Sequence, residues 1–338
     1  MAAGDKVIDL TTVKYYVSAI LSDGRLVHLE NVAENIAWED NESELSVRLN
    51  LTLRDIEFEG SRLSKILSLC SIVYLHAEWN GGNRTEIFRG TIWEWEHSRI
   101  DGDPIIVTGY DMLYYLQKTT DSAYWAKGKT TEEICSDVLA NWEIPLGGYT
   151  GPEYTHEKTL YKNKTIASML TETLEEARKK TGVKSVIRAS EGDCYILERG
   201  SNEDIWNFEA GKNLVSIKDK YSMVNLVTRV VIVGKDDKKG RPKVEATLDG
   251  ATEYGILQTV KTVGSTSLDD AKDEAQELLD EKGSPERKTT ITAPDVPTVR
   301  KGDLIHISAD SMNGYFYVLG VAHNATAATM QMEVEPYE

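Results

Sequence analysis

The stretch LSVRLNLTL, residues 45–53, carries the clearest secondary-structure signal in this sequence. Leucine or valine occupies every second position, and serine, arginine, asparagine and threonine stand between them. Successive side chains of a β-strand point to opposite faces, so this alternation predicts a strand with one buried face.

Similar strand patterns lie on both sides of this stretch, within residues 1–110. Turn-forming sequences at 22–25, 80–83 and 101–103 separate them. This first part therefore predicts a small antiparallel sheet or barrel closed by one helix. We expect its other strands at 13–21, 26–29, 72–79, 86–98 and 105–109, and the helix at 62–69.

The apolar period changes to that of helices in the next part, residues 111–200. Thr130 or Thr131 can cap one helix, and Thr165 can cap a longer helix that Gly182 ends. The pattern predicts a compact α+β module. Its expected elements are helices at 110–118, 130–140 and 165–180 and strands at 185–189 and 194–198.

The last part, residues 201–338, is again rich in strand patterns. It also contains an acidic helix that begins at Ser267 or Asp269 and ends at Glu281. The predicted fold class is α+β, mainly β, with two β-modules flanking the small α+β module. The strands expected in this part lie at 225–233, 243–248, 288–292, 304–308, 315–322 and 328–334.

The charge of the chain limits its partners. The 338 residues include 38 Lys and Arg against 55 Asp and Glu, a net charge of −17. Residues 1–110 carry −8 and residues 201–338 carry −7, whereas the middle part carries −2. This charge argues against stable binding to nucleic acid or to anionic lipid.

Further features indicate the compartment. The sequence has no apolar run long enough for a membrane span, and its start lacks a signal-peptide pattern. We therefore expect synthesis in the bacterial cytoplasm. Cys70, Cys135 and Cys194 are odd in number and far apart, so we predict three buried thiols rather than disulfides.

Sequence motifs for catalysis or for tight ligand binding are incomplete. Gly128-Lys129-Thr130 resembles the end of a P-loop, but the required glycine at position 123 is an alanine. His156-Glu157 opens a zinc-binding H-E-x-x-H pattern, but position 160 is leucine. We predict no catalytic residues, no cofactor-binding residues and no metal ligands.

Some residue types could still carry chemistry. Glu94 and Glu96 flank Trp95 on one expected strand, and glycosidases use paired carboxylates beside a sugar. The carboxylates at 269–277 could suggest a cation site, but they follow the polar face of a helix. A solvated surface explains both sets better. His323 ends an apolar strand, where a place in the core or at a sheet edge is the better explanation.

The order of several short motifs resembles the baseplate hub proteins of contractile phage tails and phage-tail-like bacteriocins. This family includes the XkdQ-like hubs, late control protein D and the central baseplate hub. Each motif is weak by itself, and the order carries the resemblance. The motifs are TTEEI at 130–134, KTIASML at 164–170, YSMVNLV at 221–227, VVIVG at 230–234, YGILQ at 254–258, A-x-x-x-A-x-x-L-L at 271–279, GDLI at 302–305, GYFYVLGVAH at 314–323 and MQMEV at 330–334.

This resemblance implies a function and a set of partners. In the family, three chains form a ring, and each supplies two barrel-like modules related to the tail-tube subunit. Here those modules would be residues 1–110 and 201–338. The ring would adapt a sixfold tube to a threefold spike in the baseplate of a virion or tail-like particle. The implied partners are the spike protein, the tail tube or tube-initiator protein, the tape measure protein and the baseplate wedge proteins.

Two other functions remain open at the level of sequence. The first is a peptidoglycan-cleaving tail enzyme, for which Glu94 and Glu96 are the candidate residues. The second is a carbohydrate-binding module that uses exposed tryptophans such as Trp93 and Trp95.

Overall fold

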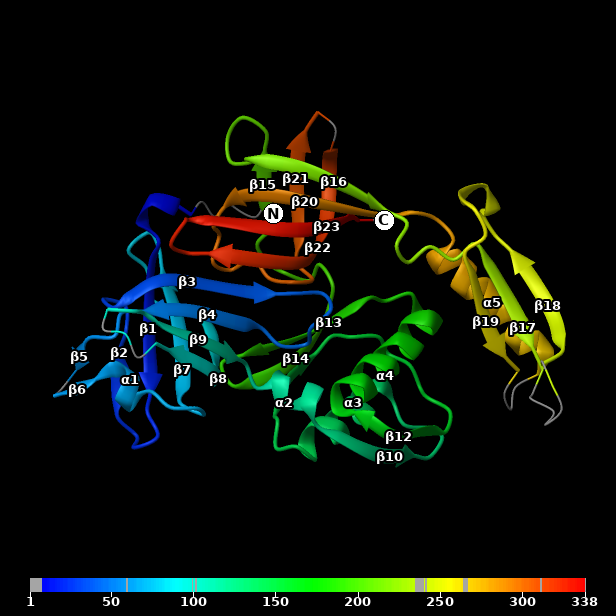
Figure 1. Cartoon of the computed structure of the whole chain (residues 1–338), viewed down its shortest axis with the longest axis horizontal. Coiled ribbons are helices and arrows are strands. Elements are labelled where there is room, and N and C mark those ends of the chain that lie inside the picture. The colour runs from blue at the N-terminus through cyan, green and yellow to red at the C-terminus, as the bar shows by residue number, and fades with distance from the viewer. Residues whose placement is uncertain are drawn as a thin grey trace. The chain divides into compact units, whose positions relative to one another are not determined.

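The computed structural model describes residues 8–58, 60–98, 100, 102–234, 240, 242–263, 267–310 and 312–337. The chain is mainly β and divides into two compact units (Figure 1). Unit 1 comprises Met1–Ile217 and Thr290–Glu338, and unit 2 comprises Lys218–Thr289. Within the described residues, no helix combines the length and the apolar character needed to cross a membrane.

The elements up to residue 209 are, in chain order, η1 (Leu10–Thr12), β1 (Lys14–Ile20), β2 (Leu26–His28), β3 (Ala33–Asp40), β4 (Arg48–Leu53), β5 (Glu57–Phe58), β6 (Ser61–Arg62), α1 (Leu63–Ile66), β7 (Ile72–Glu78), β8 (Thr85–His97), β9 (Ile105–Tyr110), α2 (Leu113–Lys118), β10 (Thr120–Trp125), α3 (Thr131–Ala140), β11 (Leu146–Tyr149), β12 (Thr159–Thr165), α4 (Ile166–Thr181), β13 (Ser185–Ser190), β14 (Asp193–Glu198) and β15 (Trp206–Glu209). The elements that follow are β16 (Ser216–Ser222), β17 (Arg229–Val233), β18 (Val244–Asp249), η2 (Thr252–Tyr254), β19 (Gln258–Thr262), α5 (Leu268–Lys282), β20 (Glu286–Pro294), β21 (Leu304–Ala309), β22 (Met312–Asn324) and β23 (Thr329–Pro336).

One sheet runs through both the first and the last parts of the chain. Its thirteen described strands follow the order β16-β20-β23-β22-β3-β4-β9-β8-β7-β1-β2, with β21 beside β22 and β15 beside β21. The alternation predicted for residues 45–53 is confirmed in β4, where Leu49, Leu51 and Leu53 are buried. The strand begins at Arg48, because residues 45–47 are held by side chains of the following module.

The first and last parts of the chain meet where β3 pairs with β22 (Figure 1). The pairing is antiparallel, with Val321 opposite Asp40 and His323 opposite Trp38. Across it, the Trp38 ring stacks on the His323 ring with centroids 4.3 Å apart. The sheet therefore continues without a break from the first part of the chain to the last.

Helices α3 and α4 of the middle part begin and end within one residue of the predicted ranges, whereas α2 begins at Leu113 rather than Tyr110, because Tyr110 ends β9. The Thr130 hydroxyl accepts the N–H of Glu133, and the Glu133 carboxylate accepts the N–H of Thr130, which forms a capping box. Thr165 is the N-cap residue of α4, as Thr130 is of α3. Gly182 ends α4 in the left-handed conformation with φ 79°. These helices pack with α2, β10, β12 and β14 around a separate apolar core.

The core of unit 2 is, among its described residues, a three-stranded sheet covered by one helix, α5. Its strand order is β18-β17-β19, and α5 packs on one face. Val230 and Ile232 of the sheet are buried beside Ala271 and Ala275 of the helix. The acidic helix predicted within the last β-module therefore packs on this smaller sheet.

Some expectations need correction. Cys135 and Cys194 are buried, but Cys70 is exposed because it lies in the turn before β7 with φ 65°. Burial raises the pKa of both Cys135 and Cys194 to about 12. The large sheet shows no closed barrel in the described part of the chain, so barrel closure stays a prediction.

Candidate functional site

The most concentrated group of buried charges lies where β3 ends. Asp40 is 1% exposed, and its carboxylate accepts the Arg300 Nε–H at 2.7 Å. The Lys301 ammonium lies 3.2 Å from its other oxygen. Burial alone would raise the pKa of Asp40, but Arg300 and Lys301 outweigh this effect and hold the pKa well below its usual range.

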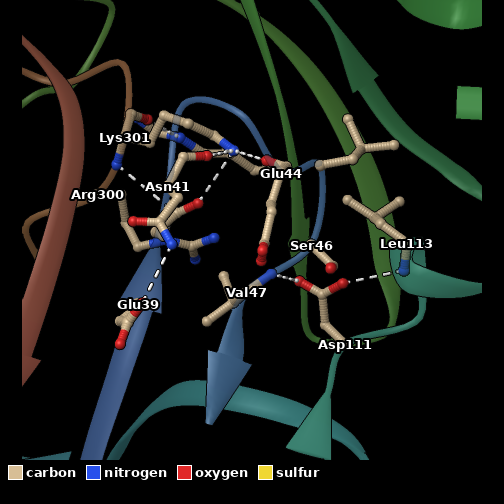
Figure 2. A network of polar contacts seen from close by, with 12 residues as sticks. Glu39, Asn41, Glu44, Ser46, Val47, Asp111, Leu113, Arg300 and Lys301 are labelled. Carbon is tan, nitrogen blue, oxygen red and sulfur yellow. Dashed lines mark hydrogen bonds and ion pairs between the residues drawn. The ribbon is translucent and has the colours of Figure 1, made fainter. Parts of the chain in front are cut away.

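Lys301 is enclosed by the loop that follows β3 (Figure 2). It is only 7% exposed, and its ammonium donates to the backbone carbonyls of Asn41 at 2.9 Å and Glu44 at 2.6 Å. With Asp40, these acceptors satisfy all three of its N–H donors. The last part of the chain thereby fixes the loop of the first part.

A tight turn at residues 300–303 presents these cations. The Asp303 carboxylate accepts the backbone N–H of Arg300 at 2.8 Å and is paired with Arg188 of β13 at 2.7 Å. Gly302 has φ 87°, and a Cβ placed there would lie 2.7 Å from the Val186 side chain. Only glycine allows the turn to approach β13 this closely.

Asp111 joins the first and middle parts of the chain (Figure 2). Its carboxylate accepts the backbone N–H groups of Val47 and of Leu113, the first residue of α2, each at 2.9 Å. Asp111 is 3% exposed. Burial raises its pKa to about 7, although these N–H groups and Arg300 favour the charged form.

We call these six side chains the junction network: Asp40, Asp111, Arg188, Arg300, Lys301 and Asp303. They come from all three parts of the chain and lie within unit 1. A buried ion pair adds little net stability, but removal of one partner leaves an uncompensated charge that costs about 3–5 kcal/mol. An arrangement of the three parts that separates these partners would therefore carry a comparable cost.

A second set of buried polar side chains lies beside the pairing of β3 with β22. His323 is 2% exposed, which confirms its predicted place in the core. Its Nδ1 lies 2.6 Å from an Asp295 oxygen, and its Nε2 lies 3.0 Å from the Val299 carbonyl. Tyr15 of β1 donates to the other Asp295 oxygen at 2.5 Å. Burial, followed by the Asp295 charge, raises the pKa of Tyr15 far above its usual value.

The glutamates of the glycosidase hypothesis lie on an open strand. Glu94 and Glu96 are exposed on β8, opposite Thr108 and Ile106 of β9. Trp93 contacts the rings of Tyr114 and Tyr115 with centroids 4.7 and 4.9 Å apart. The described residues contain no group of three His, Cys, Asp or Glu arranged to hold a metal.

One arrangement has the order of a catalytic triad. The Thr131 hydroxyl lies 3.0 Å from His156 Nε2, and His156 Nδ1 lies 3.2 Å from a Glu176 oxygen. Thr131 is 0% exposed, however, and its hydroxyl also donates to the Tyr154 carbonyl at 3.2 Å. A buried hydroxyl that is already bonded cannot meet a substrate in this arrangement, so these residues stabilise the start of α3.

Comparison with known proteins identifies the family. A family model described as YqbQ-like matches residues 38–335. The chain belongs to the YqbQ-like family. The curated protein YqbQ of Bacillus subtilis (strain 168), described as uncharacterized, is 24% identical over 235 residues, which are 68% of this chain and 70% of that protein.

Solved structures share the fold of this YqbQ-like chain. The 43 kDa tail protein of prophage MuSo2 from Shewanella oneidensis matches with a TM-score of 0.66 at 12% identity, over 94% of this chain and 97% of that protein. The tail protein of Neisseria meningitidis MC58 matches with a TM-score of 0.64 at 12% identity, over 95% and 96% of the two chains. A third match is the Escherichia coli c3393 protein, a type VI secretion component described as similar to T4 bacteriophage tail proteins. Its TM-score is 0.53 at 12% identity, over 90% of this chain and 74% of that chain. The resemblance to phage tail proteins is therefore confirmed.

The junction network of this YqbQ-like protein was not found from sequence. Asp40 and Arg300 are 260 positions apart, and neither belongs to a recognised motif. The available signal was weak: Arg300-Lys301-Gly302-Asp303 places three charges in a turn between apolar strands. Such turns are usually solvated, so the sequence alone favours a surface loop there.

Proposed function

We propose that this protein is a structural hub in the baseplate of a contractile tail or a tail-like particle, and that it has no catalytic site. The supporting observation is the sheet that continues from the first part of the chain into the last through β3 and β22. Buried ion pairs fix the same boundary. A protein that transmits mechanical load between two partners needs this kind of rigid internal connection.

In this proposal three chains form a ring. Residues 1–110 and 201–338 would each supply a module like the tail-tube subunit, so three chains would present six modules to the sixfold tube and three positions to the spike. Residues 111–200 would contact neighbouring baseplate components. The partners would be the spike protein, the tail tube or tube-initiator protein, the tape measure protein and the wedge proteins. The protein would be made in the bacterial cytoplasm and act in the baseplate.

The charge distribution fits this role. The first and last parts carry most of the net charge of −17, and acidic side chains around a central channel would repel DNA phosphates. In a particle that carries no DNA, the same charge would serve solubility. Lysine in place of carboxylates that line the channel is expected to slow genome ejection, and unchanged ejection would remove the repulsion hypothesis.

The first experiment is a mass measurement by light scattering, with negative-stain imaging of the same peak. A mass three times that of the chain, in rings with a central hole, is the expected result. Should the protein remain a monomer, the spike protein is added; rings formed only then would mean that assembly depends on that partner. A monomer under both conditions contradicts the hub proposal.

Two assays separate the alternative functions. Clearing of a bacterial cell-wall suspension, lost in Glu94→Gln and Glu96→Gln, would instead support a peptidoglycan-cleaving enzyme. Retention on a cell-wall polysaccharide column would support a carbohydrate-binding module. The hub proposal expects neither result.

A further inference from the structure

A pocket of about 160 Å³ opens within unit 1, between residues 1–110 and residues 111–200 of the chain and beside the junction network. It lies between β8, the start of α2 and the turn that joins β13 to β14. Most of its wall is apolar. The apolar side chains are Val47, Ile72, Ile87, Phe88, Met112, Tyr115 and Ala189.

The size of the pocket limits what can enter it. A cavity of about 150 Å³ lined by apolar side chains is known to take one benzene molecule. This pocket therefore holds one ring or one large side chain. Tyr115 is 44% exposed, and Ser190 and Glu191 are also exposed, so the opening lies at the surface.

Most polar groups in the wall already have partners. Both Asp111 oxygens accept backbone N–H groups. Arg89 donates to Glu86 through Nε and Nη2, and to the Glu191 carbonyl through Nη1. One exception is the buried Thr91 hydroxyl, which has no hydrogen-bond partner among the described residues.

Arg300 differs from Arg89. Its side chain is 16% exposed, and its Nε–H donates to the Asp40 carboxylate. Among the described residues, no hydrogen bond joins either amino nitrogen, Nη1 or Nη2, to another group. The pocket therefore contains a guanidinium group with unused capacity next to apolar walls.

These features favour an aromatic ring over other occupants. A carboxylate would pair with Arg300 but would also face the negative charges of Glu86 and Asp111. Asp40 pairs with the Nε side of the guanidinium, and an aliphatic group would add no electrostatic interaction with its amino nitrogens. An aromatic ring fits the apolar walls and offers its negative π face to the cation, without a net charge.

We propose that this pocket binds a single aromatic side chain of a partner polypeptide, with its ring against the Arg300 guanidinium. Single aromatic residues seated in pockets often supply much of the affinity of a protein interface. The pocket would thus be an anchoring site that joins the first and middle parts of the chain to the same partner. It does not depend on the trimeric ring.

The test uses two probes with the same number of non-hydrogen atoms on the full-length protein. N-acetylphenylalaninamide carries an aromatic ring, and N-acetylcyclohexylalaninamide carries a saturated ring on the same backbone. We expect the aromatic probe to bind about fivefold more tightly, measured by ligand-detected NMR titration. Equal affinities, or tighter binding of the saturated ring, would overturn the proposal. This comparison uses the wild-type chain and does not depend on any variant folding.

A blocking variant locates the binding. Ser190→Trp enlarges an exposed side chain at the pocket opening and should abolish binding of the aromatic probe. Ser61→Trp, at an exposed serine outside the pocket, is the control and should bind as the wild type does. Unchanged binding in Ser190→Trp contradicts the assignment. Toluene is a third probe, which carries the aromatic ring without a peptide backbone. If toluene binds and N-acetylphenylalaninamide does not, the result contradicts a polypeptide partner.

Discussion

Two carboxylates of the junction network respond to burial in opposite ways. Asp40 has two cationic partners, and its pKa is lowered. Asp111 has only backbone donors at hydrogen-bond distance, and burial raises its pKa to about 7. The difference follows from the charge of the partner, since a full cation compensates desolvation better than an amide dipole does.

This contrast predicts the pH dependence of stability. The folded protein holds the Asp111 proton more tightly than the unfolded chain does, so stability from this group is lost as pH rises from about 4 to about 7. Asp40 affects stability at lower pH than Asp111 does, because its pKa is lower in the folded protein than in the unfolded chain. Stability from Asp40 is lost only as pH falls far enough for the unfolded chain to become protonated at this residue. We expect Asp111→Asn to flatten the decrease between pH 5 and 7. Urea denaturation at several pH values measures it, and an unchanged slope would contradict the assignment.

Gly302 provides a second prediction at this scale. Gly302→Ala must place a methyl group 2.7 Å from Val186 while keeping φ at 87°. Gly24→Ala is the matched control, because Gly24 has φ 84° but no atom within 4 Å of the added carbon. We expect losses of about 3 kcal/mol for Gly302→Ala and about 1 kcal/mol for Gly24→Ala. Chemical denaturation compares them, and equal losses would show that the turn can move away from β13.

Among the elements, the pairing of β3 with β22 depends strongly on one side chain. Trp38 is 1% exposed, stacks on His323 and meets the Tyr15 ring edge-on at 5.5 Å. We expect Trp38→Leu to lower the free energy of unfolding by about 3 kcal/mol, because the smaller side chain leaves a cavity. Trp142→Leu, at a site 39% exposed, should change it by less than about 1 kcal/mol. Thermal unfolding of both variants tests this, and similar losses would exclude a special role for Trp38.

The elements also show what sequence could predict. Strands β4, β7 and β8 and helices α3 and α4 were predicted because their periodicity or their caps are local signals. Strand β3 was missed, because AENIAWED at 33–40 mixes small, polar and apolar residues without alternation. Its conformation is set by β4 on one side and β22 on the other. The junction network was missed for the same reason, since its partners are brought together only by the completed sheet.

At the scale of the whole molecule, the two units have separate cores. Val230 and Ile232 belong to the core of unit 2, and Ile305 and Ile307 belong to a core of unit 1. Separate cores predict separate stabilities. The core cluster of unit 2 contains five buried apolar residues in the described part of the chain. We therefore expect unit 2 to be the less stable of the two.

Hydrogen exchange measured by mass spectrometry tests this division. Ile232→Ala should increase exchange across residues 218–289 and leave the strands of unit 1 protected, with a local loss of about 2–5 kcal/mol. Ile305→Ala, at an equally buried position, should instead increase exchange in unit 1. If either variant opens both units equally, the chain unfolds as one cooperative body.

The pairing of β3 with β22 also sets an order of events during synthesis. β3 leaves the ribosome about 280 residues before β22, roughly 15–60 s earlier at bacterial rates of synthesis. Until then, one edge of the first β-module has no partner within the chain, and unpaired strand edges recruit other chains. Nascent chains on neighbouring ribosomes are therefore exposed to mispairing during this interval. Premature termination before β22 would make that exposure permanent, so truncated products should be the main source of aggregation when this protein is overproduced.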